Sequence, residues 1–192
     1  MTEDGLRARK QRETAQRITQ AGLRLFLDHG YEATTLDAIA AAAGISRRTF
    51  FHYFKSKDDI LLSLQSGMGE GIAAAVRTAP PGLRPLDAIR RAITDAVAEF
   101  PSDEMIRIDR LMRSNPSVQA RKQASYVEHE LVLFAALRER WPDPEQELSL
   151  RLTALAAIGA LRLSTERFSR EGGATDLVTL LDAAFDALDS GF

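Results

Sequence analysis

The stretch Thr34–Lys57, TTLDAIAAAAGISRRTFFHYFKSK, decides the fold of this chain. Its first part predicts a short helix that Thr35 caps and whose apolar face contains Ile39 and Ala40. Gly44 follows at the point where a tight turn favours a positive φ. The small side chain of Ala40, four residues before that glycine, lets a second helix cross the first closely.

The second part of the stretch predicts another short helix, which Ser46 caps and whose Phe50 and Phe54 face inward. Two helices joined in this way form a helix-turn-helix, whose second helix enters the major groove of DNA. An arginine there can bond to guanine O6 and N7, and a threonine methyl can contact thymine. The side chains left pointing outward are Arg47, Arg48, Thr49, His52 and Tyr53.

The next helix begins at Ser56, with Asp59 at the position where a capping box requires an acidic residue. Lys57 can then reach a phosphate. We expect Arg47, Arg48 and Thr49 to contact bases. The full set of expected DNA contacts is Thr35, Ser46, Arg47, Arg48, Thr49, His52, Tyr53 and Lys57. The alternative is an ordinary helical hairpin with solvated arginines.

The charge distribution agrees with a DNA-binding N-terminus. The whole chain has a formal net charge of −2. Residues 1–57 contain ten basic and six acidic side chains, whereas the remainder contains 15 basic and 21 acidic ones. A basic quarter on an acidic body indicates that one part binds a polyanion. The chain has no cysteine, which excludes disulfides, a thiolate metal site and a cysteine nucleophile.

The rest of the chain is punctuated by proline and glycine, with apolar residues at three- and four-residue steps between the breaks. No segment alternates strictly, so we predict an all-α fold without a sheet. The predicted helices lie at about 9–29, 35–42, 46–53, 56–78, 85–100, 103–114, 116–140, 144–170 and 175–189. The polar N-terminus predicts no signal peptide, and the apolar stretch 152–161 is too short to span a membrane. We therefore expect a cytoplasmic protein without a membrane partner.

Residues 9–62 resemble the DNA-binding domain of the TetR family of bacterial transcriptional regulators. The motifs that carry the resemblance are Leu25-Phe26, His29-Gly30-Tyr31, Thr34-Thr35, Ile39-Ala40, Ala43-Gly44-Ile45-Ser46, Thr49-Phe50-Phe51-His52-Tyr53-Phe54, Ser56-Lys57 and Leu61-Leu62. Many members have glycine at the place of Arg48 and Leu-Tyr at the place of Phe50-Phe51. These departures leave the fold unaffected but put the operator sequence in doubt.

The resemblance implies a nine-helix chain with a DNA-binding domain at 1–55 and a helical effector-binding and dimerisation domain at 56–192. It also implies a homodimeric regulator, most simply a repressor, that binds a palindromic double-stranded DNA operator and that a small-molecule effector releases. The rival interpretation is a helical small-molecule-binding protein or enzyme without sequence-specific DNA binding.

Two apolar stripes near the C-terminus are candidates for the dimer interface, because two such helices from each subunit would form a four-helix contact. The alternative is that both stripes pack on their own domain. The expected interface residues are Leu152, Leu155, Gly159, Leu163, Leu177, Leu181, Ala184 and Leu188.

The effector pocket is marked less clearly, because methionine and aromatic residues at helical spacing also form ordinary cores. The candidate contacts are Phe100, Met105, Arg110, Met112, Tyr126, His129 and Phe134. Gly67, Gly69 and Gly71 fall inside a predicted helix, where each costs roughly 1 kcal/mol against alanine. They provide either a hinge or a close helix contact.

Nothing in the sequence predicts an enzyme. The three histidines show no metal-ligand spacing, and there is no nucleophile elbow and no phosphate-binding loop. The paired carboxylates are explained by helix capping and solvated charge. We therefore expect no catalytic residue, no metal site and no cofactor.

Overall fold

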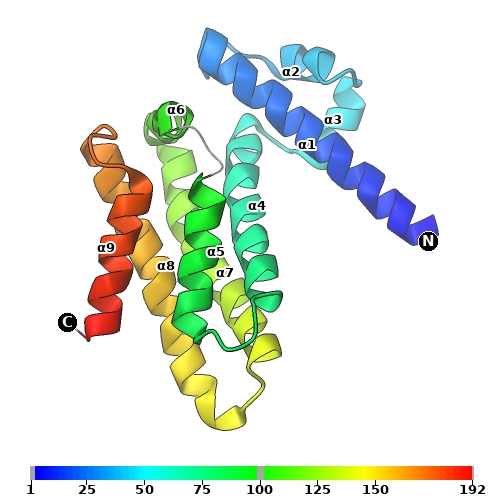
Figure 1. The fold of residues 1–192 in the computed structure, drawn as a ribbon. Coiled ribbons are helices and arrows are strands. Elements are labelled where there is room, and N and C mark those ends of the chain that lie inside the picture. Colours follow the sequence, from blue (N-terminus) through cyan, green and yellow to red (C-terminus); the bar gives the residue numbers. More distant parts are fainter. Residues whose placement is uncertain (1–2, 99–101, 192) are drawn as a thin grey trace. The chain divides into compact units, whose positions relative to one another are not determined.

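The computed structural model describes residues 3–98 and 102–191, and within these ranges the chain is all-α, as predicted (Figure 1). The described residues form nine α-helices, one short 3-10 helix and no strand. The helices are α1 (Glu3–His29), α2 (Leu36–Ala42), α3 (Arg47–Tyr53), α4 (Lys57–Arg77), α5 (Pro85–Ala98), α6 (Ser102–Arg113), α7 (Pro116–Arg140), η1 (Pro144–Gln146), α8 (Glu147–Arg170) and α9 (Leu177–Ser190).

The chain divides into two compact units. The N-terminal unit contains the chain up to Leu64 together with Leu111–Gln119, and the body contains Gln65–Arg110 and Ala120–Phe192. The N-terminal unit thus extends beyond the expected boundary at residue 55. It also includes the end of α6 and the start of α7, where Met112 and Val118 are buried.

The N-terminal unit has a small core in which α1 crosses α4 closely. A Cβ placed on Gly22 would lie 3.1 Å from the side chain of Ile60, so only glycine fits this crossing without adjustment. Gly30 and Gly44 have φ values of +88° and +65°. Both match the turns that the sequence predicts, because this backbone region favours glycine.

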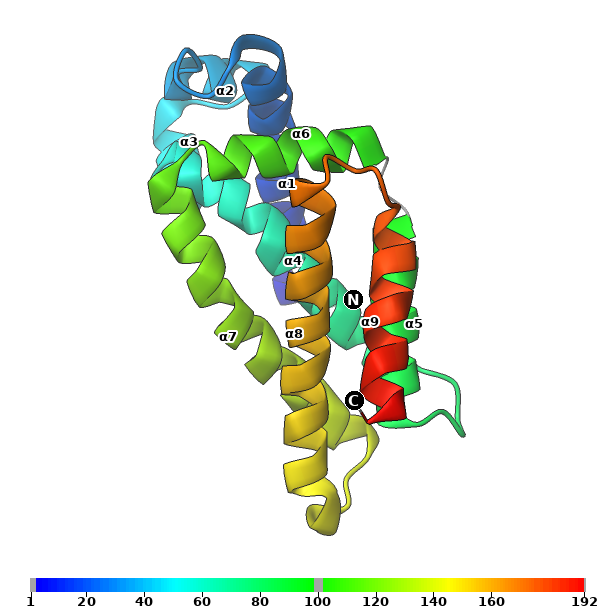
Figure 2. The same ribbon diagram turned by 90° about the vertical axis from the view of Figure 1, so that its left-hand side faces the viewer.

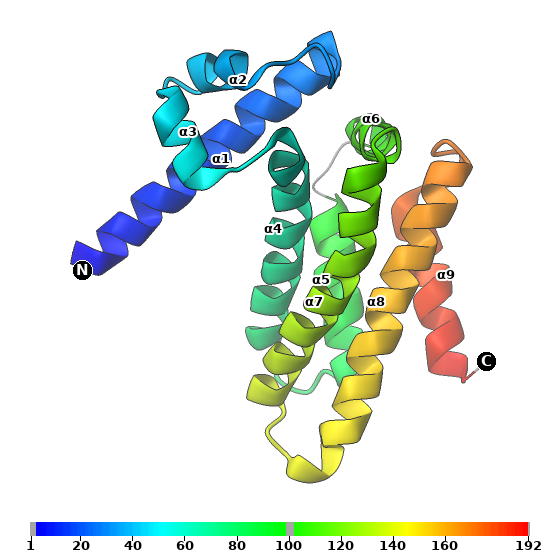
Figure 3. The ribbon, with the colours of Figure 1, turned by 180° about the vertical axis from the view of Figure 1, so that it is seen from behind.

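The body is a helical bundle whose core is shared by α4, α5, α7, α8 and α9. Figures 2 and 3 show α8 lying between α7 and α9. Ion pairs add to the contact between α5 and α9, where Arg90 binds Asp182 and Asp186 at 2.7 and 2.6 Å. Arg84 adds a further pair with Asp189 at 2.8 Å.

Helix α8 is apolar on two different faces. One face, with Leu150, Ala154 and Leu161, is buried in the core of the body. The other exposes four leucines: Leu148, Leu152, Leu155 and Leu163. By length and composition alone, Pro144–Arg170 is apolar enough to cross a membrane, yet only 39% of the apolar window is buried in the chain.

Candidate nucleic-acid interface

The helix-turn-helix is fixed by the caps that its sequence predicts. The Thr35 hydroxyl accepts a hydrogen bond from Ala38 N at 3.1 Å and begins α2. The Ser46 hydroxyl accepts one from Thr49 N at 3.0 Å and begins α3, and the two hydroxyls of Ser46 and Thr49 lie 2.8 Å apart. Each cap satisfies a backbone donor that a helix start leaves unpaired, so these short helices are held by local chemistry.

Helix α3 is amphipathic, with one side in the core and the other exposed to solvent. Phe50 is fully buried, and Phe54 follows it in the core with its ring 6.1 Å away. The exposed side chains of α3 are Arg47, Arg48, Phe51 and His52, and those of Thr49 and Tyr53 are partly buried. The outward residues expected from the sequence are therefore grouped on one short helix.

Phe51 belongs to this surface but was not among the expected DNA contacts. It is 46% exposed, which is unusual for a large apolar side chain, and it lies beside Arg47, whose guanidinium is 5.7 Å from the ring centroid. Its position four residues after Arg47 is the sequence signal that places both side chains on one face. An exposed phenylalanine can contact a thymine methyl group in the major groove.

Lys57 at the start of α4 is held against the loop after α1. Its Nζ donates to the carbonyl oxygen of Tyr31 at 2.7 Å and lies 4.4 Å from the centroid of the Tyr31 ring. The capping box predicted here is confirmed. The Asp59 carboxylate accepts from Ser56 N at 3.2 Å, and the Ser56 hydroxyl accepts from Asp59 N at 3.2 Å.

Asp58 collects three hydrogen bonds within the N-terminal unit. The Tyr31 hydroxyl donates to its Oδ1, Asn115 Nδ2 donates to the same oxygen at 3.4 Å, and the Ser117 hydroxyl donates to Oδ2. Burial, followed by the hydrogen bond to Asp58, raises the pKa of Tyr31 above its ordinary value. One carboxylate thus joins the loop after α1 and the α6–α7 turn to the first turn of α4.

The expected effector contacts are not all brought together. Phe100 lies outside the described residues, Arg110 is exposed on α6, and Met112 belongs to the N-terminal unit. Partly buried against the core of the body are Met105, Tyr126 and Phe134.

His129 lies in the same bundle, with its Nε2 atom buried. Its ring is 6.3 Å from that of Tyr126. A Cβ placed on Gly69 would lie 2.6 Å from His129 Cδ2, so α4 and α7 approach closely at this point. This contact favours close packing over a hinge as the role of Gly69.

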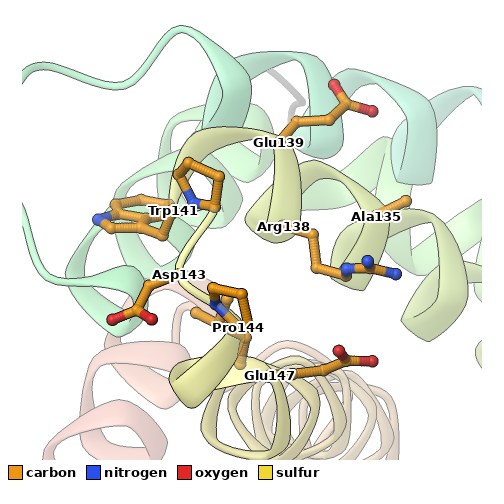
Figure 4. A pocket seen from close by; sticks show the side chains of 9 residues that line it. Ala135, Arg138, Glu139, Trp141, Asp143, Pro144 and Glu147 are labelled. Atoms are coloured by element: carbon orange, nitrogen blue, oxygen red, sulfur yellow. The ribbon is translucent and has the colours of Figure 1, made fainter.

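A surface pocket of about 380 Å³ lies at the turn between α7 and α8. Figure 4 shows Arg138 and Glu147 extending along one side of it, with Trp141 and Asp143 on the other. None of the expected effector contacts is among its lining residues. Among the described residues there is also no cluster of three or more histidine or carboxylate side chains that could hold a metal ion.

The two expected dimer stripes differ in burial. On α8, the side chains of Leu152, Leu155 and Leu163 are 53–59% exposed, and a Cβ placed on Gly159 would meet only open space. On α9, Leu177 and Leu181 are buried in the core of their own domain, and Ala184 and Leu188 are packed partly against it. Leu177 and Leu181 therefore pack on their own domain, which was the alternative to a role in the dimer interface.

Comparison with known families gives two matches that together cover most of the chain. Residues 18–64 match the model of the bacterial regulatory proteins of the tetR family. Residues 83–192 match the model of the MftR C-terminal domain.

Individual relatives are similar over nearly the full length. The transcriptional regulator TcmR of Streptomyces glaucescens is 32% identical over 97% of this chain and 86% of its own length. The putative mycofactocin biosynthesis regulator MftR of Mycobacterium tuberculosis is 29% identical over 95% of this chain and 93% of its own. The fold is also similar to the crystal structure of Thermus thermophilus FadR, a TetR family transcriptional repressor, in complex with lauroyl-CoA, with a TM-score of 0.59. The two sequences are 25% identical, and the match covers 93% of this chain and 94% of the FadR chain.

Proposed function

The chain belongs to the TetR family of bacterial transcriptional regulators, and we propose that it binds a palindromic DNA operator as a homodimer from which a small-molecule effector releases it. The observation that carries this proposal is the surface of α3. A helix capped by Ser46 and anchored by buried Phe50 exposes Arg47, Arg48 and Phe51 on one side. Guanidinium groups and an apolar ring are the side chains that recognise guanine and thymine edges in a major groove.

The roles within this surface follow from position and chemistry. Arg47, Arg48 and Thr49 contact bases, and Phe51 adds an apolar contact to thymine. The side chains that position the DNA backbone are Thr35, Ser46, His52, Tyr53 and Lys57. Two α3 helices of a dimer would occupy half-sites about 34–36 Å apart, which a palindrome of that spacing provides.

The exposed leucines of α8 support the dimer. Leu148 is 71% exposed and Leu152, Leu155 and Leu163 are more than half exposed, although apolar side chains of this size are ordinarily covered. A second copy that places its own α8 against this stripe would bury both, and Gly159 would let the two backbones approach closely.

The body supplies the effector site in this proposal. Met105, Tyr126, His129 and Phe134 place apolar surface and one imidazole in the same bundle. Binding there would favour a conformation whose two α3 helices no longer match the operator spacing. We assign the chain no reaction, and a regulator of this kind acts in the cytoplasm, where the chromosome lies.

The test is selection of bound duplexes from a random-sequence library, followed by footprinting of the enriched sequence. We expect an inverted repeat, two protected half-sites and binding that weakens steeply with salt. Enriched sequences without two-fold symmetry, or equal affinity for every duplex, would contradict the proposal. Lauroyl-CoA is a suitable first effector probe, because the related FadR was crystallised with it.

A further inference from the structure

Helix α1 is longer than the packing of the N-terminal unit requires. It contains 27 residues, and the family model begins at residue 18. Ile18 is also the first buried side chain described on this helix. Figures 1 and 3 both show the N-terminal turns of α1 continuing past α3 without another helix of the unit against them. The turns before Ile18 therefore form an arm, residues 3–17, outside the core.

The part of this arm next to the core, residues 7–17, is strongly basic. Residues 7–17 contain five basic side chains and a single acidic one, Glu13. The basic side chains are all exposed: Arg7, Arg9, Lys10, Arg12 and Arg17. Arg9 pairs with Glu13 at 3.3 Å across two exposed side chains, which water screens.

Three of the basic residues lie on one stripe of the helix. Arg7, Lys10 and Arg17 are separated by three and seven residues, a spacing that places them along one face. Glu13, three residues after Lys10 and four before Arg17, borders this stripe, and its carboxylate pairs with Arg9. At about 1.5 Å per residue the stripe is about 15 Å long, which is just under half of one DNA turn. A rigid cationic stripe of this length fits a row of phosphates along one strand.

We infer that the arm forms a second contact with double-stranded DNA, through its phosphates and independently of base sequence, beside the base contacts of α3. The inference rests on the proposed function, since α3 must first bring the unit to DNA. Charge complementarity selects DNA as the partner, because residues 7–17 carry a net charge of +4 and the whole arm, with Glu3 and Asp4 included, still carries +2. Among the described side chains of residues 7–17 only Ala15 is apolar, so an anionic membrane is the weaker fit.

The test neutralises the stripe and measures the salt dependence of binding. The variant is Arg7→Gln, Lys10→Gln and Arg17→Gln, in which glutamine keeps a helix propensity close to that of the basic residues. The matched control removes three exposed arginines from the body, by Arg91→Gln, Arg138→Gln and Arg170→Gln. The probes are a random-sequence duplex of 40 base pairs and the duplex selected above, each titrated by fluorescence anisotropy at several salt concentrations.

Each phosphate contact contributes about 0.9 to the slope of log K against log salt concentration. We expect the arm variant to lose about two to three units of slope per bound subunit, hence about five for a dimer on the selected duplex, and to keep its preference for that duplex. The control should keep the slope of the unmodified protein.

Three results would overturn the inference. An unchanged slope in the arm variant would exclude the arm contact, while the proposed function stands if Arg47→Ala still reduces discrimination between the two duplexes. A loss confined to the selected duplex would show that the arm contacts bases instead. Absence of duplex binding by the unmodified protein would refute the proposed function itself, and the arm contact with it.

Discussion

The guanidinium of Arg47 is paired with the carboxylate of Asp37 across the turn between α2 and α3, with Nη1 2.9 Å from Oδ2. The two side chains are 60% and 64% exposed. A pair this accessible to water contributes little to stability, so DNA can take the place of Asp37 at little cost. The same guanidinium lies 5.7 Å from the centroid of the Phe51 ring on α3.

Arg47→Ala should therefore reduce discrimination more than general affinity. Loss of a bidentate contact to guanine costs about 1–3 kcal/mol against the selected duplex, or roughly 5- to 150-fold, with a smaller loss on random duplex. Competition binding with both duplexes measures the difference. Asp37→Ala is the control, because it removes the partner but keeps the arginine, and it should tighten binding to both. Equal losses on both duplexes for Arg47→Ala would exclude base recognition by this residue.

Lys57→Ala should weaken binding to every duplex and shallow the salt slope by about one unit per subunit, hence about two for the dimer. It should also lower the melting temperature, because the Lys57 Nζ atom donates to the Tyr31 carbonyl. Lys57→Arg keeps the charge and serves as the control for the slope. If the alanine variant melts at a lower temperature but keeps its full salt slope, Lys57 has a structural role and makes no phosphate contact.

Tyr31→Phe should change how stability depends on pH at alkaline values. Burial and Asp58 raise the folded-state pKa of Tyr31, so above pH 10 the folded chain keeps a proton that the unfolded chain has lost. Stability that this tyrosine contributes is present below pH 10 and falls as the pH rises beyond it. We expect the phenylalanine variant to be less stable at neutral pH and the difference to shrink above pH 10, as urea unfolding at a series of pH values would show. A constant difference across that range would mean that the Tyr31 pKa is unshifted.

Local features of the N-terminal unit were predictable because they depend on residues close in sequence. The caps at Thr35 and Ser46, the capping box at Asp59 and the positive φ of Gly44 each follow from a residue type at a fixed offset. The cluster at Asp58 was not predictable in this way. Its partner Ser117 is 59 residues away, and neither residue carries a local signal of the contact.

The same limit separates the two apolar stripes near the C-terminus. Leu155 and Leu181 belong to equally regular helical patterns, so periodicity predicts an apolar face for each but not what covers it. The structure buries Leu181 completely and leaves Leu155 53% exposed. The difference arises from the packing of α9 against α5 and α8, which is a property of the whole bundle.

Substitution by alanine should stabilise the protein at two glycines of α4 and destabilise it at the third. Gly67→Ala and Gly71→Ala place a methyl group in open space, so each should raise the free energy of unfolding by about 0.5–1 kcal/mol. Gly69→Ala should lower it by about 1–3 kcal/mol, because the new Cβ would lie 2.6 Å from the His129 ring. Urea unfolding of the three variants measures this. Stabilisation by Gly69→Ala would refute the packing role.

The stabilised variants also test whether α4 must bend. If Gly67 and Gly71 form a hinge, stiffening them should raise the effector concentration needed for half-release from DNA by several-fold, without changing affinity for DNA alone. Normal release in the double variant would exclude the hinge.

Leu155→Glu should convert the dimer into monomers. The side chain is 53% exposed in one copy, so glutamate is accommodated in the monomer, but in the proposed interface the new carboxylate of each copy would be buried without a partner. Sedimentation equilibrium measures the association, and circular dichroism verifies the fold. Ala74→Glu adds the same charge at an exposed position on α4 of the body and should leave the dimer intact. Because two linked α3 helices bind a palindrome far more tightly than one, the monomer should also lose at least 100-fold in affinity for the selected duplex (roughly the gain from linking two binding sites). A Leu155→Glu protein that stays dimeric would place the interface elsewhere than on the exposed face of α8.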